Sequence, residues 1–332
     1  MSGASDVPGA RGPGDPREAI FEVVVTQLTY EADAVVSVRL ERPDGAPLPA
    51  WEPGAHVDLL LPVGITRQYS LIESPPDFSS YTIAVLQQPN SRGGSEYVHV
   101  FLRPGQRVAL GAPRNHFALD PAPHYLFLGG GIGITPLLSM VRAAALRRAR
   151  WSLHYGGRSV RSMAFAQELV AAHGDAVRLW PADERGPLPL GELLRERADD
   201  TLLYCCGPAP LLSAVQEQAE RAGWPREAIH FERFAPTVHA HGPDLPVTVV
   251  ARRSGVEVLV EEDESLLDGL ARAGVSMASS CRAGVCGACQ ATVLDGVPDH
   301  RDDVLTPAQR EAGDVMMPCV SRARGERIVL DV

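Results

Sequence analysis

The chain has 332 residues, 45% of them hydrophobic and 22% charged, so it can form two or three folded domains and is too apolar for general disorder. It carries 41 acidic and 31 basic residues, a net charge of −10, and every basic residue is arginine. We do not expect so acidic a chain to bind nucleic acid. The longest apolar run, Leu126 to Leu138, is too short to span a bilayer, so we expect no membrane partner.

Residues 1–18, MSGASDVPGARGPGDPRE, are rich in glycine and proline and lack the apolar core of a secretion signal. We expect a disordered tail there, because the segment has too little apolar surface to bury. Without an export signal, the protein is expected to be cytoplasmic.

Residues 19–120 contain short β-rich runs, such as FEVVVTQL, AVVSVRLER, HVDLLLP and YTIAVLQQ, separated by proline and glycine turns. Short strands at roughly ten-residue spacing are typical of an antiparallel β-barrel, which we predict for this region. A helical turn is expected at residues 95–102, after the motif RGGS.

Two motifs of the barrel region, RQYS and RGGS, can bind a phosphate together. An arginine, a hydroxyl and glycine amides at a helix start attract an anion, because the N–H groups and the helix dipole favour negative charge. The tyrosine of RQYS can lie flat on an aromatic ring. Together the motifs favour a flavin, and they supply Arg67, Tyr69, Ser70, Arg92, Gly93, Gly94 and Ser95.

Residues 121–234 alternate apolar strands with helices, which predicts a doubly wound parallel sheet. A glycine-rich loop, GGGIGITP, joins the first strand to its helix, although it lacks the usual GxGxxG register. The turn CGP follows a later strand at the same edge of the sheet, where such folds bind ligands. The expected nucleotide-binding residues at this edge are Gly130, Gly131, Gly133, Thr135, Cys206, Gly207 and Pro208.

Residues 235–245 are predicted to form a linker, and residues 246–332 a third unit with four cysteines. Their spacing, C-x4-C-x2-C and then a distant fourth, is that of plant-type ferredoxins and predicts a 2Fe-2S cluster. The small residues of CRAGVCGACQ let the backbone wrap closely around such a cluster. The predicted ligands are Cys281, Cys286, Cys289 and Cys319.

Two alternatives remain for these cysteines. A structural zinc site also uses four thiolates, although it more often shows two C-x2-C pairs. Four unrelated buried thiols are the other alternative, which the grouping of three cysteines within nine residues disfavours.

The ordered motifs RQYS, RGGS, GGGIGITP, YCCGP, HFERF and the cysteine set resemble the phthalate dioxygenase reductase family, the single-chain reductases of Rieske-type oxygenases. The resemblance covers about residues 20–332 and extends to vanillate demethylase reductases and to the reductase parts of some self-sufficient haem monooxygenases. It implies FMN in the barrel, NADH in the second domain, and a β-grasp, plant-type ferredoxin domain at the C-terminus.

The resemblance also implies roles for residues of the flavin site. Arg67 and Ser95 are expected to bind the FMN phosphate, with Tyr69 and Ser70 along the isoalloxazine. Phe234 is expected to cover its other face until nicotinamide displaces it. Val85 is the remaining residue expected at the FMN site. Leu86 stands where relatives commonly have a lysine, so one expected phosphate contact is missing, and Arg67, Arg92 and the amides of residues 93–95 are expected to compensate for it.

Thr135 and Cys206 are expected by the same resemblance to lie near the nicotinamide. Arg158, in YGGRSVRS, is expected to contact the nucleotide as well. Arginines there are able to bind a 2′-phosphate, which leaves NADPH possible, while the resemblance favours NADH.

The predicted function is that of a reductase component that passes electrons from NADH through FMN and the cluster to a Rieske oxygenase or demethylase. The alternatives are a reductase partner of a haem monooxygenase and a redox-sensing iron-sulfur flavoprotein. Electron transfer through cofactors requires no catalytic acid, base or nucleophile. We expect the oxygenase component to be the protein partner and the chain to be a monomer.

Overall fold

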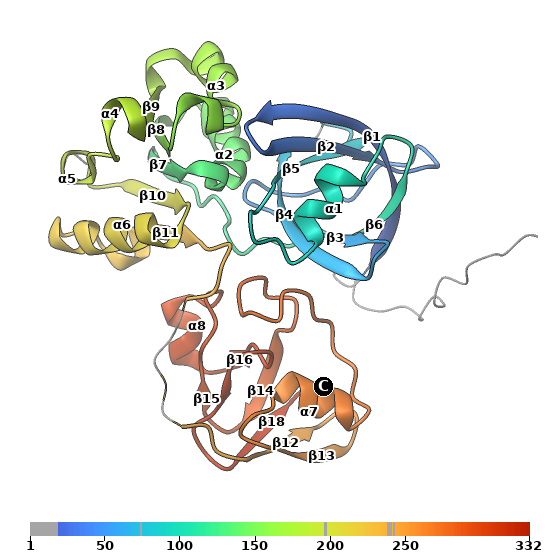
Figure 1. Cartoon of the computed structure of the whole chain (residues 1–332). Helices are drawn as coiled ribbons and strands as arrows, with labels where there is room; N and C mark the ends of the chain where they lie inside the picture. Colours follow the sequence, from blue (N-terminus) through green and yellow to red (C-terminus); the bar gives the residue numbers. More distant parts are fainter. Residues whose placement is uncertain (1–18, 74, 196–197, 238–240, 242) are drawn as a thin grey trace, which may run out of the picture.

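The computed structural model describes residues 19–332, except 74, 196–197, 238–240 and 242, and it folds into three parts in chain order (Figure 1). A closed barrel comes first, a parallel sheet with helices second, and a small mixed sheet third. This architecture confirms the predicted fold class. The predicted tail at 1–18 lies outside the described residues, and the domain boundaries remain predictions.

The first part is a closed barrel with strand order β1-β2-β5-β4-β3-β6, in which every neighbouring pair is antiparallel. Alternate residues of its strands point inward, and Val23, Val25, Leu59 and Ile83 are completely buried in its core. Its elements are β1 (Ile20–Ala32), β2 (Val35–Glu41), β3 (His56–Leu61), β4 (Ile65–Glu73), β5 (Ser80–Leu86), α1 (Gly94–Val100) and β6 (Arg107–Gly111).

Helix α1 begins one residue earlier and ends two residues earlier than the predicted 95–102. Gly93 precedes it with a φ of 86°, a left-handed conformation that costs other residues strain. The motif RGGS therefore forms the turn into the helix, and its last two residues are the first residues of α1.

The second part is a parallel sheet with strand order β11-β10-β7-β8-β9. The apolar run YLFL of β7 feeds two cores, because Tyr125 and Phe127 point to one face of the sheet and Leu126 and Leu128 to the other. The elements are β7 (His124–Gly130), η2 (Gly131–Gly133), α2 (Ile134–Leu146), β8 (Arg150–Gly157), η3 (Val160–Ser162), α3 (Ala166–His173), η4 (Gly174–Ala176), β9 (Val177–Pro181), α4 (Ala182–Arg185), α5 (Leu190–Leu193), β10 (Thr201–Cys206), α6 (Ala209–Arg221), η5 (Arg226–Ala228) and β11 (Ile229–Glu232).

Strand order reverses between β7 and β10 in this sheet. From β7 the chain moves outward to β8 and β9, then crosses back to β10 on the other side of β7. Loops at such a reversal diverge and leave a crevice at the carboxyl ends of the strands, where ligands bind in this class of fold. The glycine-rich loop after β7 and the CGP turn after β10 meet there.

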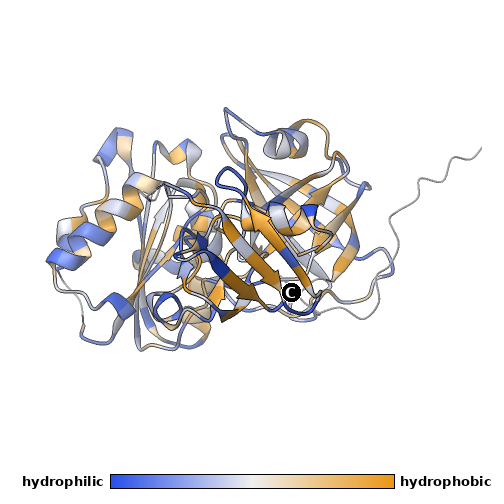
Figure 2. Ribbon diagram, turned by 90° about the horizontal axis from the view of Figure 1, so that it is seen from below, coloured by the Kyte–Doolittle hydropathy of each residue, from blue (hydrophilic) through white to orange (hydrophobic). Residues whose placement is uncertain are grey.

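The third part is a mixed sheet of order β13-β12-β18-β14-β16, with β12 parallel to β18. Helix α7 packs on it so closely that a Cβ on Gly269 would lie 2.4 Å from Val260. The sheet strands carry much of the hydrophobic colour in Figure 2. The elements are β12 (Val247–Ala251), β13 (Val256–Val260), α7 (Leu266–Arg272), β14 (Ala291–Asp295), β15 (Pro298–Asp299), α8 (Pro307–Ala312), β16 (Val315–Met316), β17 (Arg322–Ala323) and β18 (Arg327–Leu330).

Among the described residues, no helix has the length and apolar character needed to cross a membrane.

Candidate functional site

Four cysteines of the third part come together as two pairs. Cys281 contacts Cys286, and Cys289 contacts Cys319, through hydrogen bonds between their thiols. Three of the thiols are buried, and Cys281 is half-buried. The structure therefore brings together all four predicted ligands, with Cys281 at the most accessible side.

The loop that carries the first three cysteines turns through left-handed residues. Arg282, Gly284 and Gly287 have φ values of 52°, 68° and 68°. A Cβ on Gly284 would lie 2.7 Å from Val320, and one on Gly287 would lie 2.2 Å from the His116 ring. Glycine is therefore required at both positions by conformation and by space.

The environment of Cys281 favours its thiolate. A hydrogen bond with Cys286, together with backbone amides of Ala283 and Val285, lowers the pKa of Cys281 to about 5. The Ala283 amide donates to its sulfur at 3.3 Å, and the Cys281 amide donates to the Cys286 sulfur at 3.4 Å. The same hydrogen bond raises the pKa of Cys286, so within this pair the thiolate, the form that binds metal, belongs to Cys281.

The arrangement suits two irons better than one zinc ion. In the part of the chain that the structure describes, no three histidine, cysteine or carboxylate side chains converge on a point that could hold a single ion. Two pairs of thiols match a cluster in which each of two irons takes two thiolates. The residues present therefore fit a 2Fe-2S cluster.

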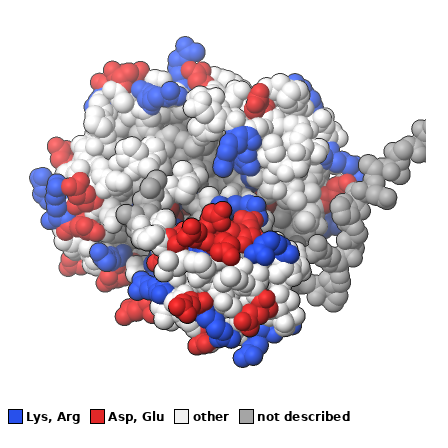
Figure 3. Space-filling model, turned by 60° about the horizontal axis from the view of Figure 1, so that its bottom comes forward, with Lys and Arg blue, Asp and Glu red and all other residues white. Residues whose placement is uncertain are grey.

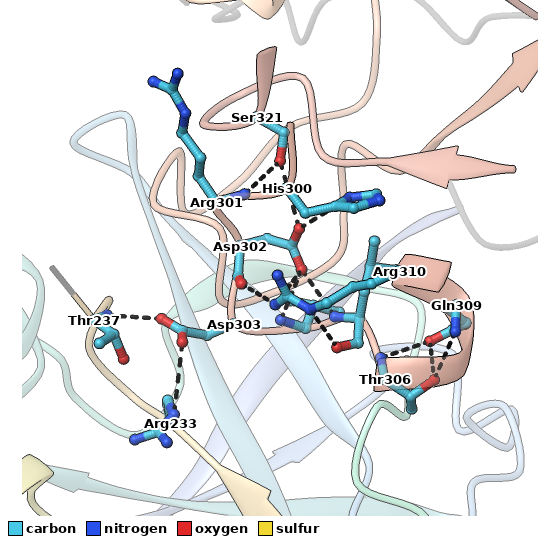
Figure 4. Close-up of polar contacts among 12 residues, drawn as sticks. Arg233, Thr237, His300, Arg301, Asp302, Asp303, Thr306, Gln309, Arg310 and Ser321 are labelled. Carbon is cyan, nitrogen blue, oxygen red and sulfur yellow. Dashed lines mark hydrogen bonds and ion pairs between the residues drawn. The ribbon is translucent and has the colours of Figure 1, made fainter. Parts of the chain in front are cut away.

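Asp302 is the centre of a network of polar contacts (Figure 4). Its side chain is fully buried and accepts hydrogen bonds from the Val304 amide at 3.1 Å and the Leu305 amide at 2.8 Å. The Arg310 guanidinium contacts the same carboxylate at 3.4 Å. Since the Asp302 backbone lies 3.0 Å from where a Gly284 Cβ would be, this network packs directly against the loop at Gly284.

Asp303 connects the loop to the end of the second part. Its amide donates to the Gly284 carbonyl at 2.8 Å, and its carboxylate accepts from the Thr237 amide at 2.7 Å. The Arg233 guanidinium lies 3.6 Å from the other carboxylate oxygen (Figure 4). The chain just after β11 is therefore tied to the cysteine loop.

The barrel brings together RQYS on β4 and RGGS before α1. Arg67 donates to the carbonyl of Arg92 at 2.8 Å, and its stem lies on Gly94, where a Cβ would come within 2.6 Å of it. Ser95 is buried, and its Oγ donates to the Ser91 hydroxyl at 3.1 Å. Arg67 and the N-terminus of α1 thus lie at one corner, where the guanidinium and the helix dipole both favour an anion.

The aromatic side of this corner fits a flavin ring. Among the described residues, the buried Oγ of Ser70 has no hydrogen-bond partner, and such an atom requires an external one. Burial raises the pKa of the neighbouring Tyr69 to about 12. Val85 lies in the barrel core with its carbonyl 2.9 Å from His99, and Leu86 packs against the core of the second part.

At the sheet edge, glycines allow two backbones to touch. A Cβ on Gly133 would lie 2.3 Å from the Cys206 carbonyl, and one on Gly207 would lie 3.0 Å from the Gly130 backbone. Gly131 has open space beside it and a φ of 53°. The glycine-rich loop and the CGP turn are therefore packed together, and Gly131 alone among these four leaves room for a ligand at its Cα.

Other predicted nucleotide residues surround this contact. Thr135 is buried, and its hydroxyl donates to the Ile132 carbonyl at 3.0 Å. Burial raises the pKa of Cys206 well above its usual value, so it is a neutral thiol. Pro208 caps helix α6 at its N-terminus, and Arg158 is exposed after β8.

Glu232 is a site residue that the motif analysis missed. It pairs with Cys206 in the register of β10 and β11, and burial raises its pKa to about 8. Part of its surface stays accessible, while Oε2 is buried without a hydrogen-bond partner among the described residues. Phe234, two residues later, is 46% exposed. The period-two alternation of HFERF was the available signal, because it places Glu232 and Phe234 on one side of the chain.

Comparisons with known proteins agree with this arrangement. The model of the oxidoreductase NAD-binding domain matches residues 127–217, and that of the 2Fe-2S iron-sulfur cluster binding domain matches residues 249–324. The chain is 42% identical over 307 residues to the phenoxybenzoate dioxygenase subunit beta of Ectopseudomonas oleovorans, covering 92% of this chain and 95% of that protein. It is 39% identical over 319 residues to the vanillate O-demethylase oxidoreductase of a Pseudomonas species, covering 94% and 100%.

Solved structures show the same three-part fold. Phthalate dioxygenase reductase, described as a modular structure for electron transfer from pyridine nucleotides to 2Fe-2S, matches with a TM-score of 0.69 at 33% identity, covering 96% of this chain and 100% of that one. An intact type IV self-sufficient cytochrome P450 monooxygenase matches with a TM-score of 0.89 at 39% identity over 97% of this chain. Only 43% of that monooxygenase is covered, so the present chain spans less than half its length.

The fold, the thiol pairs and these matches define an electron-transfer flavin iron-sulfur oxidoreductase. Its cofactors are FMN, a 2Fe-2S cluster and NADH. The chain belongs to the phthalate dioxygenase reductase family, as the sequence motifs predicted.

Proposed function

We propose that this chain is the reductase component of a two-component oxygenase, which takes electrons from NADH and delivers them singly to a Rieske non-haem iron oxygenase or demethylase. The observation that carries the proposal is the contact between the cysteine loop and the barrel: Ser280, the residue before Cys281, donates a hydrogen bond to Asp58 at 2.8 Å. The flavin-binding and cluster-binding parts are thereby joined beside the first thiol. The names of the oxygenase-system relatives support the same assignment.

The barrel residues of the proposal hold FMN by its phosphate and its ring. Arg67, Arg92 and the amides at the start of α1 supply positive charge and donors for the phosphate. Tyr69 and Ser70 line the ring, and the unpaired Ser70 hydroxyl is the group with a hydrogen bond left to make. The FMN residues proposed are Arg67, Tyr69, Ser70, Val85, Arg92, Gly93, Gly94, Ser95 and Phe234.

NADH is proposed to bind at the reversal point of the parallel sheet, next to the barrel. Gly131 lets the backbone approach the ligand, and the amides at the start of α6 favour its diphosphate. Cys206 presents a neutral thiol rather than a competing nucleophile. The NADH residues proposed are Gly130, Gly131, Gly133, Thr135, Arg158, Cys206, Gly207 and Pro208, with NADPH as the alternative nucleotide.

The cluster is proposed to be held by Cys281, Cys286, Cys289 and Cys319. Bound FMN would accept two electrons together as hydride and release them one at a time to iron. Plant-type clusters have potentials near about −400 mV, whereas Rieske centres range from about −150 to +300 mV, so delivery to a Rieske centre is downhill. The protein's part is to fix the geometry and exclude water around the thiols.

The acceptor is proposed to dock on the third part, where acidic side chains gather in the face shown in Figure 3. Exposed carboxylates in that part include Glu261, Glu262 and Asp263. Charge of one sign speeds the encounter with a partner of the opposite sign, so a basic docking face is expected on the oxygenase. A haem monooxygenase is the second candidate acceptor, favoured by the likeness to the self-sufficient P450.

A monomeric state and a cytoplasmic location complete the proposal. Both are carried over from the sequence prediction. Analytical ultracentrifugation of the cofactor-loaded protein tests the first, and fractionation of the producing cells tests the second.

Rapid mixing with NADH tests the proposed function. Flavin absorbance is expected to bleach first and cluster absorbance second, followed by electron delivery to a purified Rieske oxygenase. A redox sensor would show no steady consumption of NADH with a one-electron protein acceptor, and that result would contradict the proposal.

A further inference from the structure

A polar patch on the barrel faces the cysteine loop, and we call it the docking patch: His56, Asp58, Gln68, Arg114 and His116. It is assembled from strands β3 and β4 and the loop after β6. His56 and Arg114 exchange two backbone hydrogen bonds of 2.9 Å, which fix the loop against the start of β3.

An ion pair lies at the centre of the docking patch. The Arg114 guanidinium is 2.9 Å from Asp58 Oδ2, and only 12% and 11% of these two side chains are exposed. A carboxylate so far from water is stable only when its remaining lone pairs are also satisfied. Its second oxygen, Oδ1, accepts a hydrogen bond of 2.8 Å from Gln68, which lies opposite Asp58 on the neighbouring strand β4.

Ser280 of the third part completes the shell around this carboxylate. Its hydroxyl donates to Asp58 Oδ1 at 2.8 Å and also contacts Gln68. Hydrogen bonds to a charged acceptor are about twice as strong as neutral ones, and burial strengthens them further. The residue adjoining the most accessible thiol is therefore bound to the barrel by the strongest kind of hydrogen bond available to a serine.

The loop meets the docking patch at a second point, where Gly287 lies flat against the His116 ring. Ser280 and Gly287 stand on either side of Cys281 and Cys286 in the sequence. The Ser280 contact is a hydrogen bond to Asp58, whereas the Gly287 contact with the His116 ring is van der Waals packing. A third contact is a hydrogen bond between the His56 ring and the backbone of Cys286. Of the three, only the Ser280 contact joins the loop to a buried charge.

We propose that Asp58, held by Arg114, and Ser280 form a docking lock that keeps the ferredoxin domain on the barrel with Cys281 nearest to the flavin. This inference rests on the proposed function. Electron tunnelling falls steeply with distance, so loss of the lock slows transfer from flavin to cluster and leaves hydride transfer to the flavin untouched. Asp58 and Ser280 are thus positioning residues.

The test compares Ser280→Ala with Ser279→Ala, its exposed neighbour in the same loop. Rapid mixing of the cofactor-loaded proteins with NADH separates flavin reduction from cluster reduction. Loss of a hydrogen bond to a charged group shifts an equilibrium by about ten- to a hundredfold, so cluster reduction in Ser280→Ala should slow by a factor of up to about that size. Flavin reduction should stay at the wild-type rate in both variants, and Ser280→Thr, which keeps the hydroxyl, should restore cluster reduction.

A second measurement needs no turnover. Hydrogen-deuterium exchange of the oxidised, cofactor-loaded protein should increase in residues 279–290 and 56–58 of Ser280→Ala and stay unchanged in Ser279→Ala. Asp58→Asn should show the same two effects, slower cluster reduction and faster exchange. If Asp58→Asn folds poorly, Ser280→Ala still tests the proposal, because it keeps the Asp58–Arg114 ion pair.

The lock is overturned if Ser280→Ala and Asp58→Asn both match Ser279→Ala in cluster reduction and in exchange. Failure of the wild-type protein to reduce its cluster with NADH would instead contradict the proposed function. The two failures are therefore distinguishable.

Discussion

Cysteine and glycine gather in two regions of the molecule, the cysteine loop of the third part and the nucleotide edge of the parallel sheet, where they serve different purposes. In the loop, the thiols form pairs, and glycines supply left-handed turns around them. At the edge, Cys206 is a buried neutral thiol, and Gly133 lets one backbone touch another. The residue type alone therefore does not reveal what a cysteine or glycine does. The spacing of the cysteines along the sequence identifies the predicted metal ligands, and the contacts of each glycine show why a side chain is excluded there.

The largest effect is expected when a thiol of the loop is removed. Cys286→Ser should lose the 2Fe-2S cluster, because the remaining three thiolates cannot hold both irons. Reduction of a one-electron protein acceptor should then fall to background, while reduction of a dye that takes electrons from the flavin continues. Iron analysis, visible absorbance and the two acceptor assays check this.

Cys205→Ala is the matched control for that variant, since Cys205 is a buried thiol outside the loop. It should keep full iron content and protein-acceptor activity. Equal iron loss in both variants, or unchanged electron transfer to the protein acceptor in Cys286→Ser, would contradict the assignment of Cys286 as a cluster ligand and of Cys205 as a buried thiol without that role.

A glycine of the edge should give the next largest effect. In Gly133→Ala, the new Cβ would lie 2.3 Å from the Cys206 carbonyl, so the loop must move away. Overpacking of this kind costs about 1–3 kcal/mol, and we expect KM for NADH to rise by roughly tenfold while FMN and iron contents stay normal. Steady-state kinetics and cofactor analysis measure both.

Gly191→Ala provides the comparison, because its nearest neighbour would be 3.6 Å from the added atom. This variant should bind NADH as the wild type does. An unaltered KM in Gly133→Ala would mean that the backbone contact does not shape the nucleotide site.

The smallest effect concerns pH and Glu232, beside Cys206. Burial raises the pKa of this carboxyl from 4.5 to about 8, so the folded protein keeps a proton that the unfolded chain has released. The free energy of unfolding should therefore fall between about pH 4.5 and pH 8, and because part of the side chain is accessible to water, the fall should be on the order of 1 kcal/mol. Glu232→Gln should flatten this dependence in thermal unfolding curves, whereas exposed Glu227→Gln should not. Parallel curves for the wild type and Glu232→Gln would contradict the assignment.

Much of this architecture was predictable, because it depends on local patterns. The alternation of short runs indicated the barrel, and the uninterrupted run at Tyr125–Leu128 indicated a strand buried on both faces. The cysteine spacing predicted ligands that the structure indeed brings together in two pairs. In each case, a few neighbouring residues carry the information.

Contacts between distant segments were not predictable in this way. Asp58 and Ser280 are 222 positions apart, and neither belongs to a motif. The burial of Glu232 depends on which strand lies beside β11, and the touching backbones of Gly133 and Cys206 depend on where the chain returns to the sheet. Such features follow from the packing of three parts against one another rather than from any local pattern.

The chain just before β12 makes polar contacts with the third part, and these contacts determine where a separately produced C-terminal fragment should begin. Arg322 donates to the Leu245 carbonyl at 2.8 Å, Arg301 lies 2.6 Å from Asp244, and Asp303 binds the Thr237 amide. A fragment beginning at residue 246 would leave these largely buried charges without their partners and should unfold more easily. A fragment that begins upstream of Arg233 would keep them, so its melting temperature should be the higher of the two.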